Sequence, residues 1–317
     1  MSQKISFRAD AGQSIGYGHF IRTLALADML KDNFDCVFYT QTPSEYQKKE
    51  IAKVCPCIEL PADESRFDHF LECLHGDEIV VLDNYFYTTD YQRAIKKKGC
   101  KLVCIDDPHG IHYVCDVLLS HGNGIPSDFD VETYTRLCLG TDWAMLRKPF
   151  RRPVEWNHER NNDIVVNFGG ADPYHITEQI VGLLLQLKLN YKIKVILGDK
   201  VFLPDEYRSK VDVLRNLNAE QMAQLFDDSA FGIFAASTVC LEGQSRGLPI
   251  IVGYYVENQE KYYNRIKESG NYATLDYLQN TTKEKLRGAI DSVPFIHRLK
   301  MSAEDIPSRY VNLFNSI

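Results

Sequence analysis

Short, almost continuously apolar runs alternate with amphipathic segments along most of the chain. Such runs are typical of strands in a parallel sheet that is covered on both faces. Several intervening segments carry apolar residues at helical spacing. The pattern therefore predicts an α/β protein built from parallel sheets. In the first half, the predicted strands are residues 5–10, 36–40, 79–84, 102–106, 114–120 and 136–140, with a helix at 89–98.

The alternation stops at residues 146–162, which are polar, aperiodic and contain prolines, so this stretch is predicted to be a linker. Two βα repeats joined by one linker predict two Rossmann-like domains facing a central cleft. We expect domains at 1–150 and 160–317, with a final helix able to pack back on the first domain. In the second half, the predicted strands are 164–168, 193–198, 211–214, 231–236 and 249–254, and the predicted helices are 177–188, 219–226, 238–246 and 259–269.

Residues 7–30 are the most informative segment for function. A strand ends here, a glycine-containing loop follows, and His19 precedes a helical stripe of apolar residues. Ionisable groups at the carboxyl edge of a sheet and beside a helix N-terminus are a common arrangement for ligand chemistry. A dinucleotide fingerprint fits poorly, because Ile21 stands where the third glycine is required.

Composition and charge narrow the possible partners. The chain has 317 residues with 44% hydrophobic and 25% charged side chains, values typical of a soluble globular protein. A net charge of −7 disfavours nucleic acid and anionic membranes as partners, and we expect no stable membrane association. The nine cysteines are an odd number, and several lie in apolar runs, so we expect reduced thiols in a cytoplasmic protein.

One short segment resembles a metal site. Asp106, Asp107, His109, His112 and Cys115 lie close together in the sequence. They belong to a single loop region, without a second ligand pair elsewhere in the sequence. We therefore expect neither a metal ion nor a cofactor.

The second half contains two candidate binding loops. Gly169, Gly170 and Asp172 follow a predicted strand and precede a helix, which suits either a phosphate-binding loop or an ordinary βα turn. In the other loop, Ser237 or Thr238 is positioned to cap a helix.

Three polar residues follow this second loop. Glu242 lies one helical turn beyond Thr238, where its carboxylate can accept both hydroxyls of a ribose or remain solvated. Asn258 and Gln259 follow the next predicted strand and are further candidates for ligand binding.

The motifs together resemble a known group of proteins. The second half is similar to the nucleotide-binding half of GT-B proteins. The opening segment is similar to that of the UDP-sugar hydrolases of pseudaminic acid biosynthesis. The resemblance covers nearly the whole chain and rests on residues 8–10, 15–19, 22, 24–27, 83–85, 105–107, 139–140, 146–147, 169–173 and 237–259.

The resemblance implies a GT-B fold and hydrolysis of UDP-2,4-diacetamido-2,4,6-trideoxy-β-L-altropyranose by water attack at C1. It implies that His19 is the catalytic base and that the protein is an enzyme; we expect it to be a monomer. From the residues alone, Arg8 or Arg22 can bind phosphate or pair with Asp10 or Asp28. The full set of expected substrate-binding residues is Arg8, Asp10, Gly16, Gly18, Arg22, Asp83, Tyr85, Gly169, Gly170, Asp172, Ser237, Thr238, Glu242, Asn258 and Gln259.

Three alternatives stay open. A GT-B glycosyltransferase would use the same UDP-sugar with a different acceptor, a binding module would lack turnover, and a UDP-sugar 2-epimerase would also release UDP. The sequence also leaves open whether Asp83, Asp106 or Asp107 assists catalysis.

Overall fold

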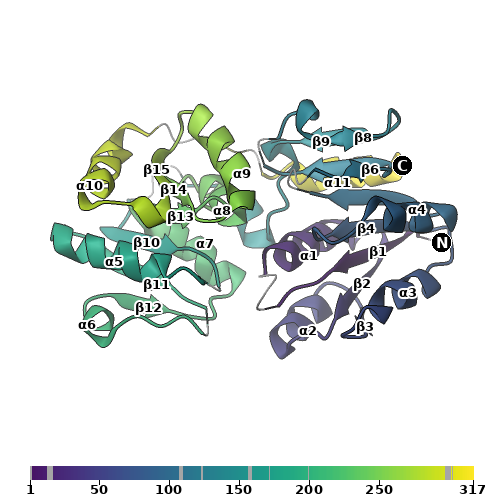
Figure 1. The fold of residues 1–317 in the computed structure, drawn as a ribbon, viewed down its shortest axis with the longest axis horizontal. Helices are drawn as coiled ribbons and strands as arrows, with labels where there is room; N and C mark the ends of the chain where they lie inside the picture. The colour runs from purple at the N-terminus through teal and green to yellow at the C-terminus, as the bar shows by residue number, and fades with distance from the viewer. Residues whose placement is uncertain are drawn as a thin grey trace. The chain divides into compact units, whose positions relative to one another are not determined.

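The computed structural model describes residues 2–12, 17–106, 110–122, 124–155, 159–170, 172–198, 200–296, 301 and 303–317. The chain divides into two compact units (Figure 1). Unit 1 contains Met1–Arg147 and Glu304–Ile317, and unit 2 contains Lys148–Ala303.

Unit 1 is built on a seven-stranded parallel sheet in the order β3-β2-β1-β4-β5-β7-β9. The strand order reverses direction at β1, because β2 lies on one side of it and β4 on the other. Its strands are β1 (Lys4–Ala9), β2 (Asp35–Gln41), β3 (Cys57–Leu60), β4 (Ile79–Asp83), β5 (Lys101–Ile105), β7 (Val117–Ser120) and β9 (Arg136–Leu139). Its helices are α1 (Gly18–Leu30), α2 (Glu45–Ala52), α3 (Ser65–Glu72), α4 (Thr89–Lys97) and α11 (Ile306–Asn315).

Helices cover both faces of this sheet, as the continuous apolar strands predict. On β2, Phe38 packs against Phe20 of α1, with ring centroids 5.8 Å apart. The next residue, Tyr39, points to the opposite face and packs against Phe70 of α3 at 5.0 Å. Neighbouring residues of one strand thus belong to two separate cores.

Two segments of unit 1 differ from the expected pattern. The predicted strand 114–120 is shorter, because β7 begins only at Val117. Before it, β6 (His112–Tyr113) pairs with β8 (Asp130–Val131) in a separate two-stranded sheet. The edge strand β3 was not predicted, since two of its four side chains are exposed and its apolar pattern is weak.

Unit 2 is built on a six-stranded parallel sheet in the order β12-β11-β10-β13-β14-β15, with its reversal between β10 and β13. Its strands are β10 (Asp163–Asn167), β11 (Lys192–Ile196), β12 (Asp212–Leu214), β13 (Phe231–Ala235), β14 (Ile250–Tyr254) and β15 (Ala273–Tyr277). Its helices are α5 (Ile176–Leu187), α6 (Asp205–Arg208), α7 (Ala219–Asp228), α8 (Thr238–Ser245), α9 (Glu257–Glu268) and α10 (Lys283–Ser292).

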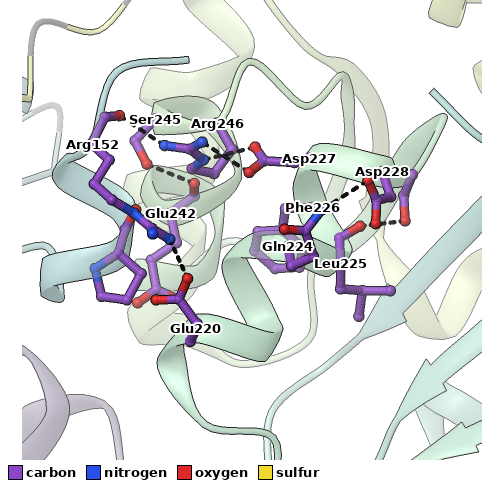
Figure 2. A network of polar contacts seen from close by, with 12 residues as sticks. Arg152, Glu220, Gln224, Leu225, Phe226, Asp227, Asp228, Glu242, Ser245 and Arg246 are labelled. Atoms are coloured by element: carbon purple, nitrogen blue, oxygen red, sulfur yellow. Dashed lines mark hydrogen bonds and ion pairs between the residues drawn. The ribbon is translucent and has the colours of Figure 1, made fainter. Parts of the chain in front are cut away.

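Much of the predicted linker is packed onto unit 2. Phe150 is fully buried, and its ring lies 5.9 Å from that of Phe226 on α7. Figure 2 shows Arg246, at the end of α8, donating to both carboxylate oxygens of Asp227 and to the carbonyl of Arg152. These contacts fix α8 against α7 and attach the linker to both helices.

The last helix, α11, belongs to unit 1. It packs against α1, and its Phe314 is 2% exposed, with its ring 6.1 Å from that of Phe34. The hydroxyl of Tyr310 donates to the carbonyl of Trp143 at 2.6 Å. Residues far apart in the sequence therefore complete one core.

We predict that Phe314→Ala lowers the free energy of unfolding of unit 1 by about 3–5 kcal/mol, because it leaves a cavity beneath α11. Hydrogen exchange of the α1 amides under increasing urea measures this loss. Ile125→Ala is the control in the same unit: Ile125 is 42% exposed, so its loss should be well below that of Phe314→Ala. Equal losses for the two variants would contradict a packed role for α11.

Candidate functional site

The candidate catalytic group lies where the strand order of unit 1 reverses. His19 is in the first turn of α1, which follows β1, and Asp83 is the last residue of β4. β1 and β4 are neighbours on opposite sides of the reversal. Parallel sheets bind ligands at the carboxyl ends of strands at such a point.

The Asp83 carboxylate joins α1 to β4. One oxygen lies 2.7 Å from His19 Nδ1 and accepts from Arg22 Nη2 at 2.7 Å. The other accepts from Arg22 Nε and from the Thr23 hydroxyl, both at 2.7 Å. The Asp83 side chain has no exposed surface. Three residues in the first two turns of α1 thus contact one buried group.

This arrangement determines the orientation of the imidazole. An ionised carboxylate only accepts hydrogen bonds, so His19 Nδ1 must carry the hydrogen that faces Asp83. In the neutral imidazole, the lone pair is then on Nε2, where it can accept a proton. The Tyr85 ring contacts the imidazole edge-on, with centroids 4.7 Å apart. His19 itself is only 8% exposed.

Asp83 remains ionised despite its burial. Burial alone would raise its pKa, but the positive charge of Arg22, the charge of His19 and the hydrogen bonds from both outweigh that effect. The pKa of Asp83 is therefore held well below its ordinary value. A permanent negative charge is thus fixed beside His19.

Two of the expected substrate-binding residues pair with each other here, and their roles toward a substrate stay predictions. Asp83 was expected to bind substrate, but its oxygens accept four hydrogen bonds from protein groups, which fills the capacity of a carboxylate. Arg22 was expected to bind phosphate or to pair with Asp10 or Asp28, and it pairs with Asp83 instead. Both residues position His19.

Arg8 and Asp10 were also expected to bind substrate, but both are completely buried. The Arg8 guanidinium donates to both carboxylate oxygens of Asp10. The Asp10 carboxylate also accepts from the backbone of Gln41 at 2.8 Å, and its own amide donates to Asn84 at 2.7 Å. The pair holds the ends of β1, β2 and β4 together and presents no surface to a ligand.

The remaining expected positions in unit 1 are less informative. Gly18 is the first residue of α1, and a Cβ there would meet no atom within 4 Å, so packing does not require a glycine. Asp106 is buried and accepts a hydrogen bond from the Tyr113 hydroxyl. Gly16 and Asp107 lie outside the described residues.

In unit 2, the first of the two expected binding loops leads into α5. The first amides of this helix already donate to a side chain of the protein. Asp172 is 4% exposed and accepts from the amides of Ile176 and Thr177, both at 2.9 Å. Asp172 therefore satisfies the first two amides of α5, and its role as a substrate contact stays a prediction. Gly169 has φ of +93°, a conformation that favours glycine, and Gly170 follows it.

The second loop leaves its helix end open. Ser237 is the N-cap of α8 and is exposed, but its hydroxyl makes no capping hydrogen bond and points to the Ala235 carbonyl at 3.3 Å. Thr238 begins the helix, and the first turn has no acidic residue. A helix N-terminus without a side-chain cap attracts anions through its amide groups and dipole. The structure therefore favours α8 over α5 as the anion site.

Further candidates surround this helix. Glu242 lies on α8 and is 4% exposed, so it is not a freely solvated helix residue. Gln259 accepts from the amide of Tyr255 at 3.1 Å. Asn258 is the second residue of α9.

Sequence reasoning missed two residues that shape these sites. Thr23 binds Asp83, and its only sequence signal is its place one residue after Arg22. Tyr255 connects the end of β14 to the first of the two loops, because its hydroxyl donates to the Phe168 carbonyl at 2.8 Å. Its position directly after β14, at the same sheet edge as Phe168, is the signal that could have identified it.

Comparison with solved structures defines the fold. MurG of Acinetobacter baumannii has a TM-score of 0.63 at 12% identity, with coverage of 99% of this chain and 100% of that one. The calicheamicin glycosyltransferase CalG4 has a TM-score of 0.64 at 10% identity, with coverage of 100% and 98%. The protein therefore has the GT-B fold, as the sequence predicted.

Sequence comparison gives two relatives. An uncharacterised protein of Methanocaldococcus jannaschii is 24% identical over 307 residues, which cover 89% of this chain and only 60% of that protein. The UDP-2,4-diacetamido-2,4,6-trideoxy-β-L-altropyranose hydrolase of Campylobacter jejuni is 25% identical over 290 residues, which cover 86% of this chain and all of that protein. No family model matches the chain.

The described residues contain neither a metal-binding cluster nor a membrane-spanning helix. No described group of three or more His, Cys, Asp or Glu side chains is arranged to hold a metal ion. His109, part of the candidate metal segment, lies outside the described residues. No described helix is long and apolar enough to cross a bilayer.

We predict that Asp83→Asn lowers the free energy of unfolding by about 3–5 kcal/mol at about pH 7, because it leaves the Arg22 charge buried without its partner. The folded pKa of Asp83 is depressed, so its contribution is complete above the unfolded value of about 3.9 and is lost as the pH falls towards the folded value. The difference between wild type and variant should therefore shrink below about pH 4.

Urea unfolding at several pH values measures this difference. The matched control is Asp90→Asn, because the Asp90 side chain is 89% exposed in its pair with Arg93. A wild-type advantage that stays constant down to about pH 2 would contradict the ionised state of Asp83.

Proposed function

We propose that the protein hydrolyses a UDP-linked 2,4-diacetamido-2,4,6-trideoxy sugar to the free sugar and UDP, as a step of pseudaminic acid biosynthesis. The observation that carries the proposal is His19, held by Asp83 at 2.7 Å at the strand reversal of unit 1. The name of the Campylobacter jejuni relative supports the choice of sugar.

In the proposed reaction, His19 Nε2 accepts a proton from water as the water oxygen attacks C1 of the sugar. The bond between C1 and the diphosphate oxygen breaks, and its electron pair leaves with UDP. Asp83 stabilises the imidazolium formed in this step, because its negative charge lies against Nδ1. His19 then releases the proton to solvent.

Unit 2 supplies the proposed nucleotide site. The open N-terminus of α8 at Ser237 and Thr238 suits a diphosphate, which neutral amide groups and the helix dipole would stabilise. Gly169 and Gly170 offer backbone amides at the neighbouring strand end. We propose that Glu242, four residues beyond Thr238, accepts hydrogen bonds from the ribose hydroxyls.

A glycosyltransferase is the second candidate. MurG and CalG4 share the fold, and CalG4 is the calicheamicin glycosyltransferase. In such a reaction, His19 would take its proton from an acceptor hydroxyl instead of from water. The two candidates differ in whether UDP is released when water is the only nucleophile.

The first test follows UDP-2,4-diacetamido-2,4,6-trideoxy-β-L-altropyranose with the purified protein in ¹⁸O-water by NMR and mass spectrometry, without an acceptor. We expect free sugar with ¹⁸O at C1, together with unlabelled UDP. His19→Ala should lower kcat by about 10²–10⁴-fold because the base is removed, while UDP binding persists.

The control is His69→Ala, since His69 is an exposed histidine on α3 of the same unit. Unlabelled sugar with ¹⁸O in the UDP would refute attack at C1, and intact substrate that binds without turnover would favour the transferase. Full activity of His19→Ala would exclude His19 as the base.

We also predict that Glu242→Gln raises the KM for the UDP-sugar about tenfold or more, because hydrogen bonds to a charged acceptor are weakened. Steady-state kinetics and calorimetry with UDP measure the effect. Glu206→Gln is the control, because Glu206 is an exposed residue of α6 in the same unit. An unchanged KM together with unchanged UDP affinity would refute the ribose assignment.

A further inference from the structure

Two exposed tyrosines lie together near His19. Tyr17 is the N-cap of α1 and is 37% exposed, and Tyr46 lies in the first turn of α2 and is 44% exposed. Their ring centroids are 5.9 Å apart with planes at 74°, an edge-to-face contact. Isolated exposed aromatic residues are common, but an adjoining pair at a sheet edge beside a candidate base suggests a binding role.

The pair rests on the core of unit 1. The Tyr46 ring also packs against Phe20, which is 1% exposed, at 6.5 Å. The Tyr17 carbonyl accepts the first backbone hydrogen bond of α1 from Ile21 at 2.9 Å. The aromatic surface is therefore supported from below by a fixed helix.

The order of the strands places this surface relative to His19. Tyr46 follows β2, Tyr17 and His19 follow β1, and Tyr85 follows β4, while the sheet order is β2-β1-β4. Aromatic side chains therefore lie on both sides of His19 along the carboxyl edge of the sheet. Tyr85 is in direct contact with the imidazole.

The remaining surface of the pair suits a specific part of a sugar. Aromatic rings bury apolar C–H surface favourably, whereas covering a hydroxyl without a hydrogen bond is costly. Burial raises the pKa of the Tyr46 phenol, although the nearby charge of Arg147 opposes this, so its hydroxyl stays a hydrogen-bond donor. This surface suits a sugar face that carries methyl and ring C–H groups, with one hydrogen-bond acceptor next to them.

We propose that Tyr17 and Tyr46 form a platform that binds the methyl-bearing face of the sugar and selects deoxy and acetamido sugars over fully hydroxylated hexoses. This inference rests on the proposed function, because it assigns the sugar to the His19 edge of unit 1.

Tyr17→Ala and Tyr46→Ala test the platform. Each should raise the KM for the UDP-linked trideoxy sugar about tenfold, with UDP affinity changed by less than about twofold. Tyr17→Phe and Tyr46→Phe should keep most of the affinity, because the ring makes the contact. Tyr134→Ala is the control, since Tyr134 is 55% exposed elsewhere in unit 1.

Saturation-transfer NMR on the intact UDP-sugar gives a readout that does not need turnover. In a His19→Ala background, which leaves the UDP-sugar intact, the protein should transfer saturation to the sugar methyl groups, and both alanine substitutions should remove that transfer while uridine signals persist. Methyl signals that persist in both alanine variants, or an unchanged KM, would overturn the platform.

The two proposals fail in different ways. If wild type binds the UDP-sugar without releasing UDP, hydrolysis is refuted, and the methyl signals still decide the platform. If wild type does not bind the UDP-sugar, both are overturned. Circular dichroism of each variant verifies that the fold is retained.

Discussion

The Asp83 carboxylate is the interaction on which the arrangement of unit 1 depends. One buried anion receives hydrogen bonds from His19, Arg22 and Thr23, so the first turns of α1 are fixed on the end of β4. An isolated buried carboxylate would be strongly destabilising, and the Arg22 charge is what keeps it ionised. The same balance that holds the helix in place also orients the imidazole. The Asp83 carboxylate therefore contributes both to the stability of unit 1 and to the proposed chemistry of His19.

In unit 2, the N-termini of α5 and α8, which follow the two expected binding loops, differ in their hydrogen bonding. α5 is closed by its own Asp172, whereas α8 begins at Ser237 without a side-chain cap. The C-terminal end of α8 is nevertheless firmly held, because Arg246 binds Asp227 and the linker. An open but rigid helix end is pre-organised for an anion, since little motion has to be lost on binding.

The sequence predicted the α/β fold class because short, continuously apolar runs alternate with segments of helical period. It placed His19 at a sheet edge because the residues after a parallel strand lie there. It could not predict the partners of Asp83, since His19 is 64 positions away. Residues such as Arg8 and Asp172 have the chemistry of a binding site, but only the fold reveals that buried neighbours or helix amides already occupy them. The weakly apolar edge strand β3 was missed for lack of pattern.

The position of α11 has a consequence for biosynthesis. Unit 1 consists of Met1–Arg147 and Glu304–Ile317, so Lys148–Ala303 forms an insertion within it. During translation, the whole unit 2 sequence is made before the segment that packs Phe314 against Phe34 of unit 1. The apolar surface beneath Phe314 therefore stays uncovered until α11 has been made and released, long after the rest of unit 1. Chaperone dependence of the nascent chain should accordingly concentrate on the half that was synthesised first.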